Sequence, residues 1–409
     1  LGGLDWHAAQ SIFPAVTCSV QAAMRTASPA AKHGMISNGL HFRALHRPAF
    51  WEQSADLVAG RRIWDRFRAA GRTVGLMFWQ QSLGERADLV LSPAPIHKHS
   101  GGMVQDCYSQ PADLYARLRS KIGRPFNLMR YWGPLASPSV GDWIAEAVVA
   151  VLRDDHTAPD LLLAYLPTLD YDLQRYPHDH ARVAKALTAA IGQIERIIHA
   201  ARDQGYHVLV YGDYAITPTA PGDAAVFPNR ELARAGLFTT RRVAGRTYGD
   251  FHTARAWAMV DHELAHVYVR DAHDLPAVGE VLHALPGVAE ILDRSAQAAL
   301  HCDHPNAGEL LILAEPGRWL AYPWWSGARE APDYARHIDI HNKPGFDPCE
   351  LLFGWPPWTV TQNTARIRGT HGRAGSDRKV AWATTLALSA APTSLLELAA
   401  AVAQWLDSQ

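Results

Sequence analysis

A strand–helix–strand unit in the middle of the chain sets the strongest limit on its fold. Residues 161–166 and 207–211 are short apolar runs of the kind that form buried strands. Between them, residues 182–202 place apolar side chains at helical spacing, and Gly205 follows as a helix stop. Two strands joined by such a helix are expected to run parallel through a right-handed crossover. The unit therefore predicts the α/β class.

Other segments fit the same class. Residues 73–79, 265–269 and 309–313 are expected to be strands, and residues 384–406 a strand and a helix. The 409 residues suffice for one large α/β domain with an insertion, or for two domains. We expect a core in residues 1–215, and a cap or insert with some core strands in residues 216–347, which are rich in Pro, Gly, His and Trp. Residues 348–409 would return to the core.

Charge and cysteine content exclude several kinds of protein. The 39 basic and 40 acidic residues nearly balance, which argues against a nucleic acid polymer or an anionic membrane as the main partner. The chain contains no apolar run of about 20 residues, so the sequence predicts no membrane-spanning helix. The cysteines at 18, 107, 302 and 349 are too widely spaced for a zinc ribbon or a disulfide scaffold.

The sequence assigns neither a definite cellular compartment nor an oligomeric state. A soluble, cytoplasmic location is slightly favoured, and the oligomeric state is unknown. Because the first residue is Leu1 rather than Met, the chain is expected to be a fragment or processed, and a targeting segment could be missing.

The most informative segment is residues 14–38, PAVTCSVQAAMRTASPAAKHGMISN. Thr17 follows an extended PAV stretch, and residues 19–25 are expected to form the first turns of a helix. A hydroxyl at a helix N-terminus meets free backbone N–H groups and the positive end of the helix dipole, a setting that suits an oxygen attacking a phosphoryl group. A lone threonine there would more often only cap the helix. Its neighbour Cys18 is expected to be buried and inert.

The same segment resembles the nucleophile region of the nucleotide pyrophosphatase/phosphodiesterase family, within the alkaline phosphatase superfamily. The family pattern is Pro-x-x-Thr, a Thr nine residues on, His-Gly seven beyond it and Asn five after the His. The matching residues here are Pro14, Thr17, Thr26, His33, Gly34 and Asn38. The resemblance implies a three-layer α/β/α core with a mainly parallel sheet and an inserted cap. It also implies that Thr17 is the nucleophile and that Asn38 donates a hydrogen bond to a phosphoryl oxygen.

Two aspartates follow the two strands of the crossover unit. Asp170 comes after the first strand and Asp213 after the second, so their carboxylates should lie close together. A cation is the usual reason to tolerate such a pair. By resemblance, Asp170 matches the aspartate of the family's Asp-x-x-x-His segment, Asp213 that of Ser-Asp-His-Gly-Met, and His371 the histidine of the last metal segment. The two neighbouring histidine positions hold Gln174 and Tyr214 instead.

The departures from the family pattern leave two interpretations. Either other residues rebuild the metal sites, or the sites have decayed and the aspartates are remnants. Candidate substitute ligands are Gln174, Tyr214, Asp172, His341 and His262. We rank His341, in a polar loop, above His262 and His266, which lie four residues apart before a predicted strand in the phrase VDHELAH. The family's first aspartate position falls ahead of Leu1.

The resemblance implies a metal-dependent hydrolase. The expected reaction cleaves a phosphodiester or pyrophosphate bond through a phospho-threonine intermediate, with two divalent ions, Zn²⁺ favoured over Mn²⁺ or Mg²⁺. The expected partner is a small phosphate ester, with nucleotides among the candidates. The alternatives are a phosphonate or phosphomonoester hydrolase on the same site, or a non-catalytic binding protein with a degenerate metal site. Candidate stacking groups for a base or ring are Trp51, Phe78, Trp79, Trp324 and Trp325.

Overall fold

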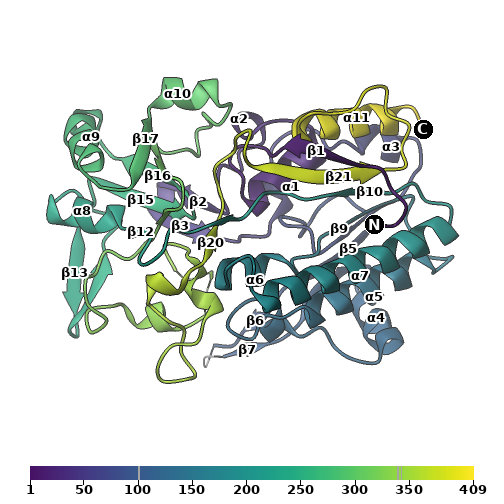
Figure 1. Cartoon of the computed structure of the whole chain (residues 1–409), viewed down its shortest axis with the longest axis horizontal. Helices are drawn as coiled ribbons and strands as arrows, with labels where there is room; N and C mark the ends of the chain where they lie inside the picture. The colour runs from purple at the N-terminus through teal and green to yellow at the C-terminus, as the bar shows by residue number, and fades with distance from the viewer. Residues whose placement is uncertain (100–101, 339, 342) are drawn as a thin grey trace.

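The computed structural model describes residues 1–99, 102–338, 340–341 and 343–409, and arranges them as two lobes side by side (Figure 1). The first lobe contains both ends of the chain and the predicted crossover unit. The second is built mainly from residues of the middle of the chain. In the described part of the chain, no helix is long and apolar enough to cross a membrane.

Two sheets form the middle layer of the first lobe. One has the strand order β8–β5–β4–β9, with the bounds Cys107–Gln110, Leu89–Pro93, Val74–Met77 and Leu161–Ala164. The other has the order β1–β21–β10, with the bounds Trp6–Gln10, Lys379–Thr384 and Leu209–Tyr211. The strands expected around residues 73–79, 161–166 and 207–211 are therefore present. β9 and β10 are each the last strand of their sheet.

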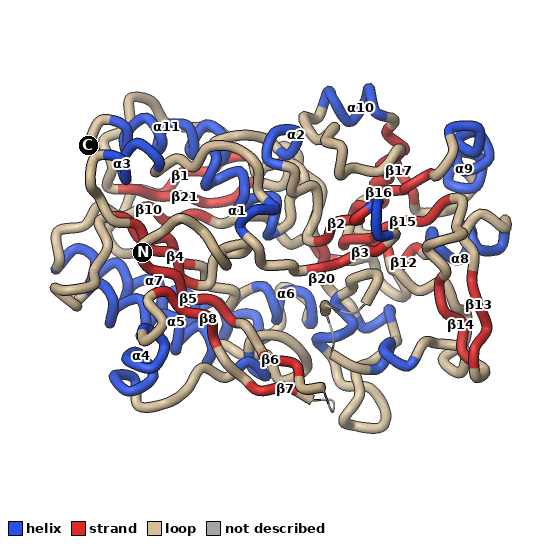
Figure 2. Tube along the Cα trace, turned by 180° about the vertical axis from the view of Figure 1, so that it is seen from behind, coloured by secondary structure: helices blue, strands red, loops and turns tan. Residues whose placement is uncertain are grey.

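Helices cover both faces of these sheets, which gives the expected α/β/α layering (Figures 1 and 2). One layer contains α4, α5 and α7, with the bounds Leu114–Ile122, Ser139–Leu152 and Ala181–Asp203. The other contains α1, α3 and α11, with the bounds Thr17–Thr26, Asp65–Ala69 and Leu395–Asp407. α7 matches the predicted crossover helix, and Gly205 lies just beyond it in the left-handed region at φ +76°. The α/β class is confirmed.

Parallel pairing is less extensive than expected. It joins β4 to β5 and β9, and β12 (Ala225–Val226) to β19 (Trp319–Leu320), whereas every other ladder between described strands is antiparallel. Part of the reason is that the sheet of the second lobe is antiparallel throughout.

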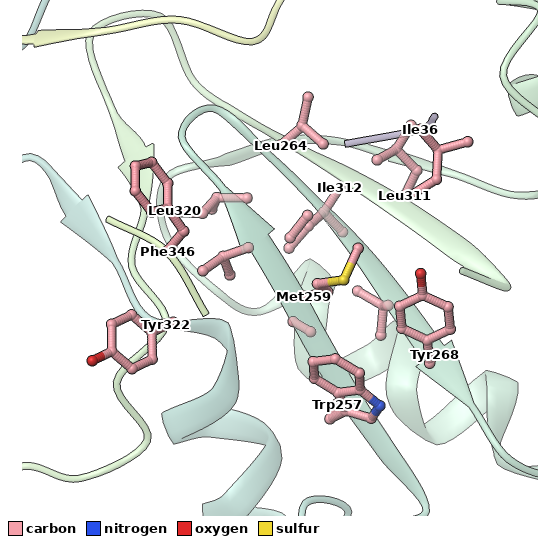
Figure 3. Packing of buried hydrophobic residues seen from close by; sticks show 14 of the residues in the cluster. Ile36, Trp257, Met259, Leu264, Tyr268, Leu311, Ile312, Leu320, Tyr322 and Phe346 are labelled. Atoms are coloured by element: carbon pink, nitrogen blue, oxygen red, sulfur yellow. The ribbon is translucent and has the colours of Figure 1, made fainter. Parts of the chain in front are cut away.

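The second lobe surrounds a hydrophobic core that also includes Cys18 and Ala22 of α1. Its sheet runs β15–β16–β18–β17, with the bounds Ala256–Asp261, Leu264–Val269, Leu310–Ala314 and Val288–Leu292. Every residue of β15 and β16 is buried, so both faces of these strands are covered. Figure 3 shows Trp257, Met259 and Ile312 packed together in this core. The hairpin of β2 (Gly39–Phe42) and β3 (Arg47–Phe50) packs on β15, so a segment of the N-terminal region joins this lobe. The domain boundaries expected at residues 215 and 347 stay predictions.

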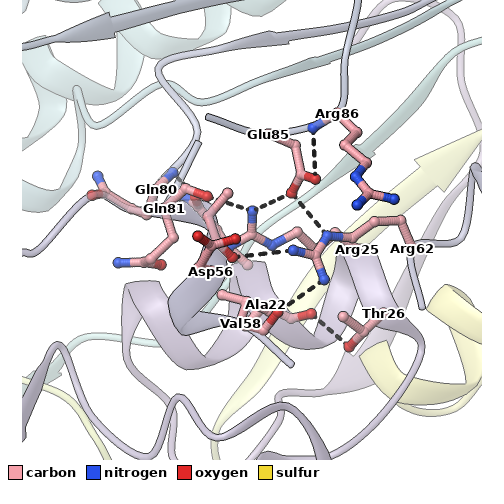
Figure 4. A network of polar contacts seen from close by, with 12 residues as sticks. Ala22, Arg25, Thr26, Asp56, Val58, Arg62, Gln80, Gln81, Glu85 and Arg86 are labelled. Carbon is pink, nitrogen blue, oxygen red and sulfur yellow. Dashed lines mark hydrogen bonds and ion pairs between the residues drawn. The ribbon is translucent and has the colours of Figure 1, made fainter. Parts of the chain in front are cut away.

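The helix that begins at Thr17 is anchored at its other end by a buried ion pair (Figure 4). Arg25, in the last turn of α1, is fully buried, and its Nη1 lies 3.2 Å from Glu85 Oε2. Nη1 also donates to the carbonyl of Gln81 at 2.7 Å, and Arg62 Nε donates to the same Glu85 oxygen at 2.8 Å. Burial lowers the pKa of the Arg25 guanidinium to about 9, so this cation depends on its partners for stability.

Removal of Glu85 should therefore strongly destabilise the fold. We expect Glu85→Ala to lower the free energy of unfolding by about 3–5 kcal/mol, because Arg25 would stay buried without its counterion. Urea denaturation followed by circular dichroism measures this change. The matched control is Glu146→Ala, which breaks the exposed Arg124–Glu146 pair and should cost less than about 1 kcal/mol. Equal losses in the two variants would contradict a special role for the buried pair.

Candidate active site

A cavity of about 210 Å³ brings together most of the predicted site residues, from both lobes. The predicted residues that line it are Thr17, Asn38, Asp170, Gln174, Tyr214, His262, His341 and His371. Asp213 and Asp172 are not among its lining residues. Positions as far apart in sequence as 17 and 371 thus meet around one small space.

Thr17 has the predicted local structure. It is the first residue of α1 and follows Val16, whose backbone is extended at φ −132°. The side chain is buried, and its Oγ1 lies 3.0 Å from the phenolic oxygen of Tyr214. The hydroxyl therefore stands at a helix N-terminus with a specific hydrogen-bond partner.

Tyr214 and Gln174, at the two positions where the resemblance predicts histidine, belong to one hydrogen-bond chain. Tyr214 donates to Asp170 Oδ1 at 3.1 Å, and Gln174 Nε2 donates to Asp170 Oδ2 at 2.8 Å. Both carboxylate oxygens of Asp170, which belongs to α6 (Asp170–Arg175), therefore have a donor. Because the single phenolic proton goes to Asp170, the Thr17 hydroxyl is left to donate to Tyr214. The chain runs from Thr17 through Tyr214 and Asp170 to Gln174, whose Oε1 is 3.3 Å from His262 Nε2.

Asn38 is held in place by Asp261. The Asn38 Oδ1 accepts the backbone N–H of Cys18 at 3.0 Å, and its Nδ2 donates to Asp261 Oδ1 at 3.1 Å. The Asn38 backbone N–H donates to Asp261 Oδ2 at 2.8 Å. Burial opposes ionisation of Asp261, but hydrogen bonds from His262 and Asn38 keep its pKa below the usual value. The second Nδ2 hydrogen of Asn38 has no hydrogen-bond partner among the described residues. The sequence offers no signal for this role of Asp261 beyond its place beside His262.

Two histidine rings lie against each other in the wall of the cavity. His262 lies in the turn between β15 and β16 at φ +58°, and its Nδ1 is 2.8 Å from Asp261 Oδ1. Its ring is tilted by 33° from that of His371, with the centroids 3.8 Å apart, and the His371 ring stacks on Tyr214 at 3.9 Å. Burial, then the neighbouring His262, lowers the pKa of His371 well below the usual value, so its ring is neutral. Since Nδ1 donates to the carbonyl of Ala15 at 2.9 Å, Nε2 keeps the lone pair that a metal ligand needs.

Of the candidate substitute histidines, His262 and His341 both line the cavity, and His262 is part of the hydrogen-bond chain that reaches Thr17. His266 lies elsewhere, in β16, where its Nε2 bonds the carbonyl of Ile36. Asp172 forms a buried ion pair with Arg175 at 3.3 Å rather than facing the cavity.

Asp213 lies behind Tyr214. Its Oδ1 accepts the backbone N–H of Tyr214 at 3.0 Å, whereas its Oδ2 is buried and has no hydrogen-bond partner among the described residues. Burial and the charge of Asp170 raise the pKa of Asp213 to about 7. An unpartnered carboxylate oxygen next to a second carboxylate is a chemically suitable place for a divalent cation.

The aspartates and His371 do not form a compact three-ligand cluster. Within the described ranges, the only group of three His, Cys, Asp or Glu side chains with ligand atoms within 4.8 Å of one another is Asp271, His273 and Asp274, outside this cavity. At the predicted site, the Tyr214 ring stacks on the His371 ring. The Tyr214 hydroxyl is hydrogen-bonded to both Thr17 and Asp170.

The wall of the cavity is aromatic. Of the five candidate stacking residues, Trp51 lines it, whereas the other four pack in the hydrophobic cores. Trp51 adopts the left-handed region at φ +59°, an uncommon conformation for so large a residue. Its ring lies 5.4 Å from that of Phe346, which in turn lies 5.3 Å from that of Trp132. The sequence did not single out Phe346 or Trp132, because aromatic residues are common in cores as well as in sites.

The geometry can be compared with known proteins. Residues 3–347 match the model of the type I phosphodiesterase/nucleotide pyrophosphatase family, and the chain belongs to that family. No curated protein gives a match to the sequence.

Several solved structures share the fold. Phosphonoacetate hydrolase from Sinorhizobium meliloti 1021, in complex with phosphonoformate, is 14% identical, with a TM-score of 0.61 over 99% of this chain and 87% of that one. Murine ectonucleotide pyrophosphatase/phosphodiesterase 5 is 11% identical, with a TM-score of 0.59 over 98% and 86%. Its inactive threonine-to-alanine variant, in complex with AMP, gives the same values. The family and these relatives are hydrolytic enzymes, and the relatives bind small phosphate or phosphonate ligands.

The raised pKa of Asp213 predicts a pH-dependent stability. Its folded pKa of about 7 lies above the ordinary value of 3.8, so the folded chain holds a proton that the unfolded chain releases between these values. In chelator-treated protein, the melting temperature should therefore fall as the pH rises through that window. Calorimetry of Asp213→Asn should show a flatter profile, and Asp377→Asn, at an 81% exposed side chain, should not. Identical profiles for both variants would contradict the assignment.

Proposed function

We propose that the protein hydrolyses phosphodiester bonds in small phosphate esters, with Thr17 as the attacking residue. The observation that carries this proposal is the Thr17 hydroxyl at the N-terminus of α1, hydrogen-bonded to Tyr214 at the wall of a small cavity. Family membership supports the reaction class, and the inactive threonine-to-alanine variant of the murine relative supports a threonine in this role.

The hydrogen-bond chain prepares Thr17 for attack. As its oxygen forms a bond to phosphorus, its proton passes to Tyr214 and the phenolic proton passes to Asp170. The bond from phosphorus to the departing oxygen breaks, and that oxygen takes a proton from solvent. Water then attacks the phospho-threonine: its oxygen bonds to phosphorus, the bond from phosphorus to the Thr17 oxygen breaks, and a proton of the water restores the Thr17 hydroxyl. Asp170 releases the proton it received to solvent, which returns the site to its starting state. The free Nδ2 hydrogen of Asn38 would donate to a phosphoryl oxygen as charge develops there.

Divalent cations would complete the site. Asp170, Asp213 and His371 are the residues that would hold them, and the unpartnered Oδ2 of Asp213 is the observation that favours this. Zn²⁺ is the first candidate because an imidazole is present, with Mn²⁺ and Mg²⁺ as alternatives. When bound, such ions supply Lewis-acid stabilisation of the charge on the phosphoryl oxygens. Gln174 and Tyr214 would offer only weaker oxygen ligands.

Substitution of Thr17 tests the reaction. Thr17→Ala should lower kcat on a nitrophenyl phosphodiester by at least about 10³-fold, because the nucleophile is lost. Thr188→Ala, at an exposed site on α7, should leave kcat unchanged. Chelation should abolish wild-type turnover, and Zn²⁺ or Mn²⁺ should restore it in the wild type but not in Thr17→Ala.

The same assay separates the alternatives. Faster turnover of a phosphonate or phosphomonoester than of any diester would favour those activities on the same site. Binding of the esters without turnover, in metal-loaded protein, would favour a binding protein. Full activity of Thr17→Ala would overturn the mechanism.

The cavity narrows the substrate class. None of its described lining residues is Lys or Arg, and aromatic and aliphatic side chains form much of its wall. A polyphosphate chain would place further negative charge where no basic side chain compensates it, next to Asp170. A diester with one negative charge and a planar organic group suits the aromatic wall better. The cavity therefore favours aryl or nucleoside phosphodiesters over pyrophosphates.

Trp51 should determine how strongly the site prefers an ester that carries an aromatic ring. We expect Trp51→Ala to raise KM about fivefold for phenyl p-nitrophenyl phosphate, since a stacked aromatic pair contributes about 1 kcal/mol. KM for methyl p-nitrophenyl phosphate should hardly change. Trp355→Ala, at an 85% exposed tryptophan, is the control. A preference for ATP over every diester would contradict the proposed substrate class without contradicting hydrolysis through Thr17.

A further inference from the structure

Two tryptophans at the tip of one loop make little contact with the rest of the chain. Trp355 is 85% exposed and Trp358 is 78% exposed, and they are the only exposed tryptophans among the described residues. Phe353, in the same loop, is also exposed. Because tryptophan carries a large apolar surface, two of them exposed on one loop indicate a surface that a partner covers.

The loop that holds them is a closed hairpin, residues 353–360, which we call the tryptophan hairpin. Phe353 forms an antiparallel bridge with Val360, and the amide of Gly354 donates to the carbonyl of Thr359 at 2.8 Å. The Thr359 hydroxyl donates to the carbonyl of Pro356 at 2.6 Å. An ordered backbone therefore presents the two indole rings to the outside.

Exposed apolar side chains also occur on a second hairpin, formed by β6 (Ile96–His97) and β7 (Met103–Val104). Ile96, Met103 and Val104 are all exposed. A third segment, residues 128–135, exposes Met129 and Leu135. Most of the exposed large apolar side chains of the first lobe therefore belong to these segments.

Two sets of hydrogen bonds join the three segments into one surface. The amide of Leu128 donates at 3.1 Å to Oε1 of Gln105, which directly follows β7. Arg175 of α6 donates from Nη2 to the carbonyl of Gly133 at 2.7 Å and from Nε to that of Leu351 at 3.0 Å. Leu351 lies two residues before the tryptophan hairpin. We call the exposed apolar side chains of these three segments the apolar rim.

The apolar rim borders the candidate active site. His97, Met103 and Met129 line the cavity of about 210 Å³ and are themselves exposed, so the cavity reaches the surface here. In Figures 1 and 2, β6 and β7 lie on the opposite side of the molecule from α10 (Arg294–Ala299). A partner that covers the rim would therefore meet the entrance of the cavity.

The exposed ionic groups of these segments are all basic. Residues 96–105, 128–136 and 351–366 contain no Asp or Glu, and they expose Lys98, Arg130 and Arg366. The near balance of charge over the whole chain therefore does not hold at this surface. Apolar side chains bordered by basic groups complement a layer of phosphate headgroups over hydrocarbon.

We propose that the apolar rim docks on the surface of a phospholipid bilayer, with the two tryptophans inserted among the headgroups. Tryptophan favours this depth because its ring is apolar while its N–H needs a polar partner. A protruding tip enters a fluid layer without a matching pocket, whereas a protein partner would have to supply one. Docking places the entrance of the cavity at the headgroup layer. The proposal concerns binding alone and does not depend on the proposed reaction.

Sedimentation with vesicles tests the proposal. The probe is sucrose-loaded vesicles of phosphatidylcholine that contain one quarter phosphatidylserine. Trp355→Ser combined with Trp358→Ser should weaken binding at least about tenfold, because two large apolar side chains are lost from the bilayer. The matched control, Leu45→Ser combined with Leu300→Ser, removes two exposed leucines outside the rim and should bind as the wild type does.

The basic groups are tested separately. Lys98→Gln combined with Arg130→Gln should weaken binding to these vesicles at least about tenfold and make it less sensitive to salt. Binding to vesicles of phosphatidylcholine alone should change little. All the substituted side chains are exposed, so every variant should keep the melting temperature of the wild type.

A quenching measurement reports insertion directly. Brominated lipids should quench part of the tryptophan fluorescence of the wild type, and the double tryptophan variant should lose that quenching. Absence of wild-type binding to the mixed vesicles would overturn the proposal, as would equal binding by the double tryptophan variant or an equal loss in the leucine control. Self-association that the tryptophan substitutions abolish, without vesicle binding, would instead assign the rim to a second copy of this chain.

Discussion

The placement of α1 is the constraint on which the rest of the site depends. Its first residue supplies the Thr17 hydroxyl, and its last turn supplies the buried Arg25. Because Glu85 and the carbonyl of Gln81 fix Arg25, the helix has little freedom to move along its axis. A rigid helix of ten residues thus links a buried ion pair to the hydroxyl on the wall of the cavity.

Residues 174 and 214 determine how the site is held together. The amide of Gln174 connects Asp170 to His262, and the phenol of Tyr214 connects Asp170 to Thr17. These groups neutralise no charge, so the two aspartates remain a costly pair, as the raised pKa of Asp213 shows. Hydrogen bonds alone therefore hold the site residues in place, and the carboxylates of Asp170 and Asp213 still lack a compensating positive charge.

The sequence predicted what depends on local pattern. Helix α7 and strands β4, β9 and β10 were predicted from the spacing of apolar residues. The place of Thr17 at the start of a helix was predicted from the segment around it. It could not predict that Asp261 orients Asn38, because the two are 223 residues apart and the bond arises only when the lobes pack together. For the same reason the sequence did not indicate that Phe346 and Trp132 lie near each other, and the positive φ that His262 adopts in its tight turn cannot be predicted from residue type alone.

The position of Asp261 has a wider consequence. It ends β15 in the second lobe, yet Ser37 and Asn38 both donate to it, and its neighbour His262 reaches Gln174 in α6 of the first lobe. The chemistry is therefore assembled where the two lobes meet, and the hydrophobic cluster around β15 and β16 extends to Cys18 and Ala22 of α1. A substitution in this shared core would consequently disturb the Thr17 hydroxyl and the turn at Asp261 together, because closely packed side chains transmit strain to their neighbours.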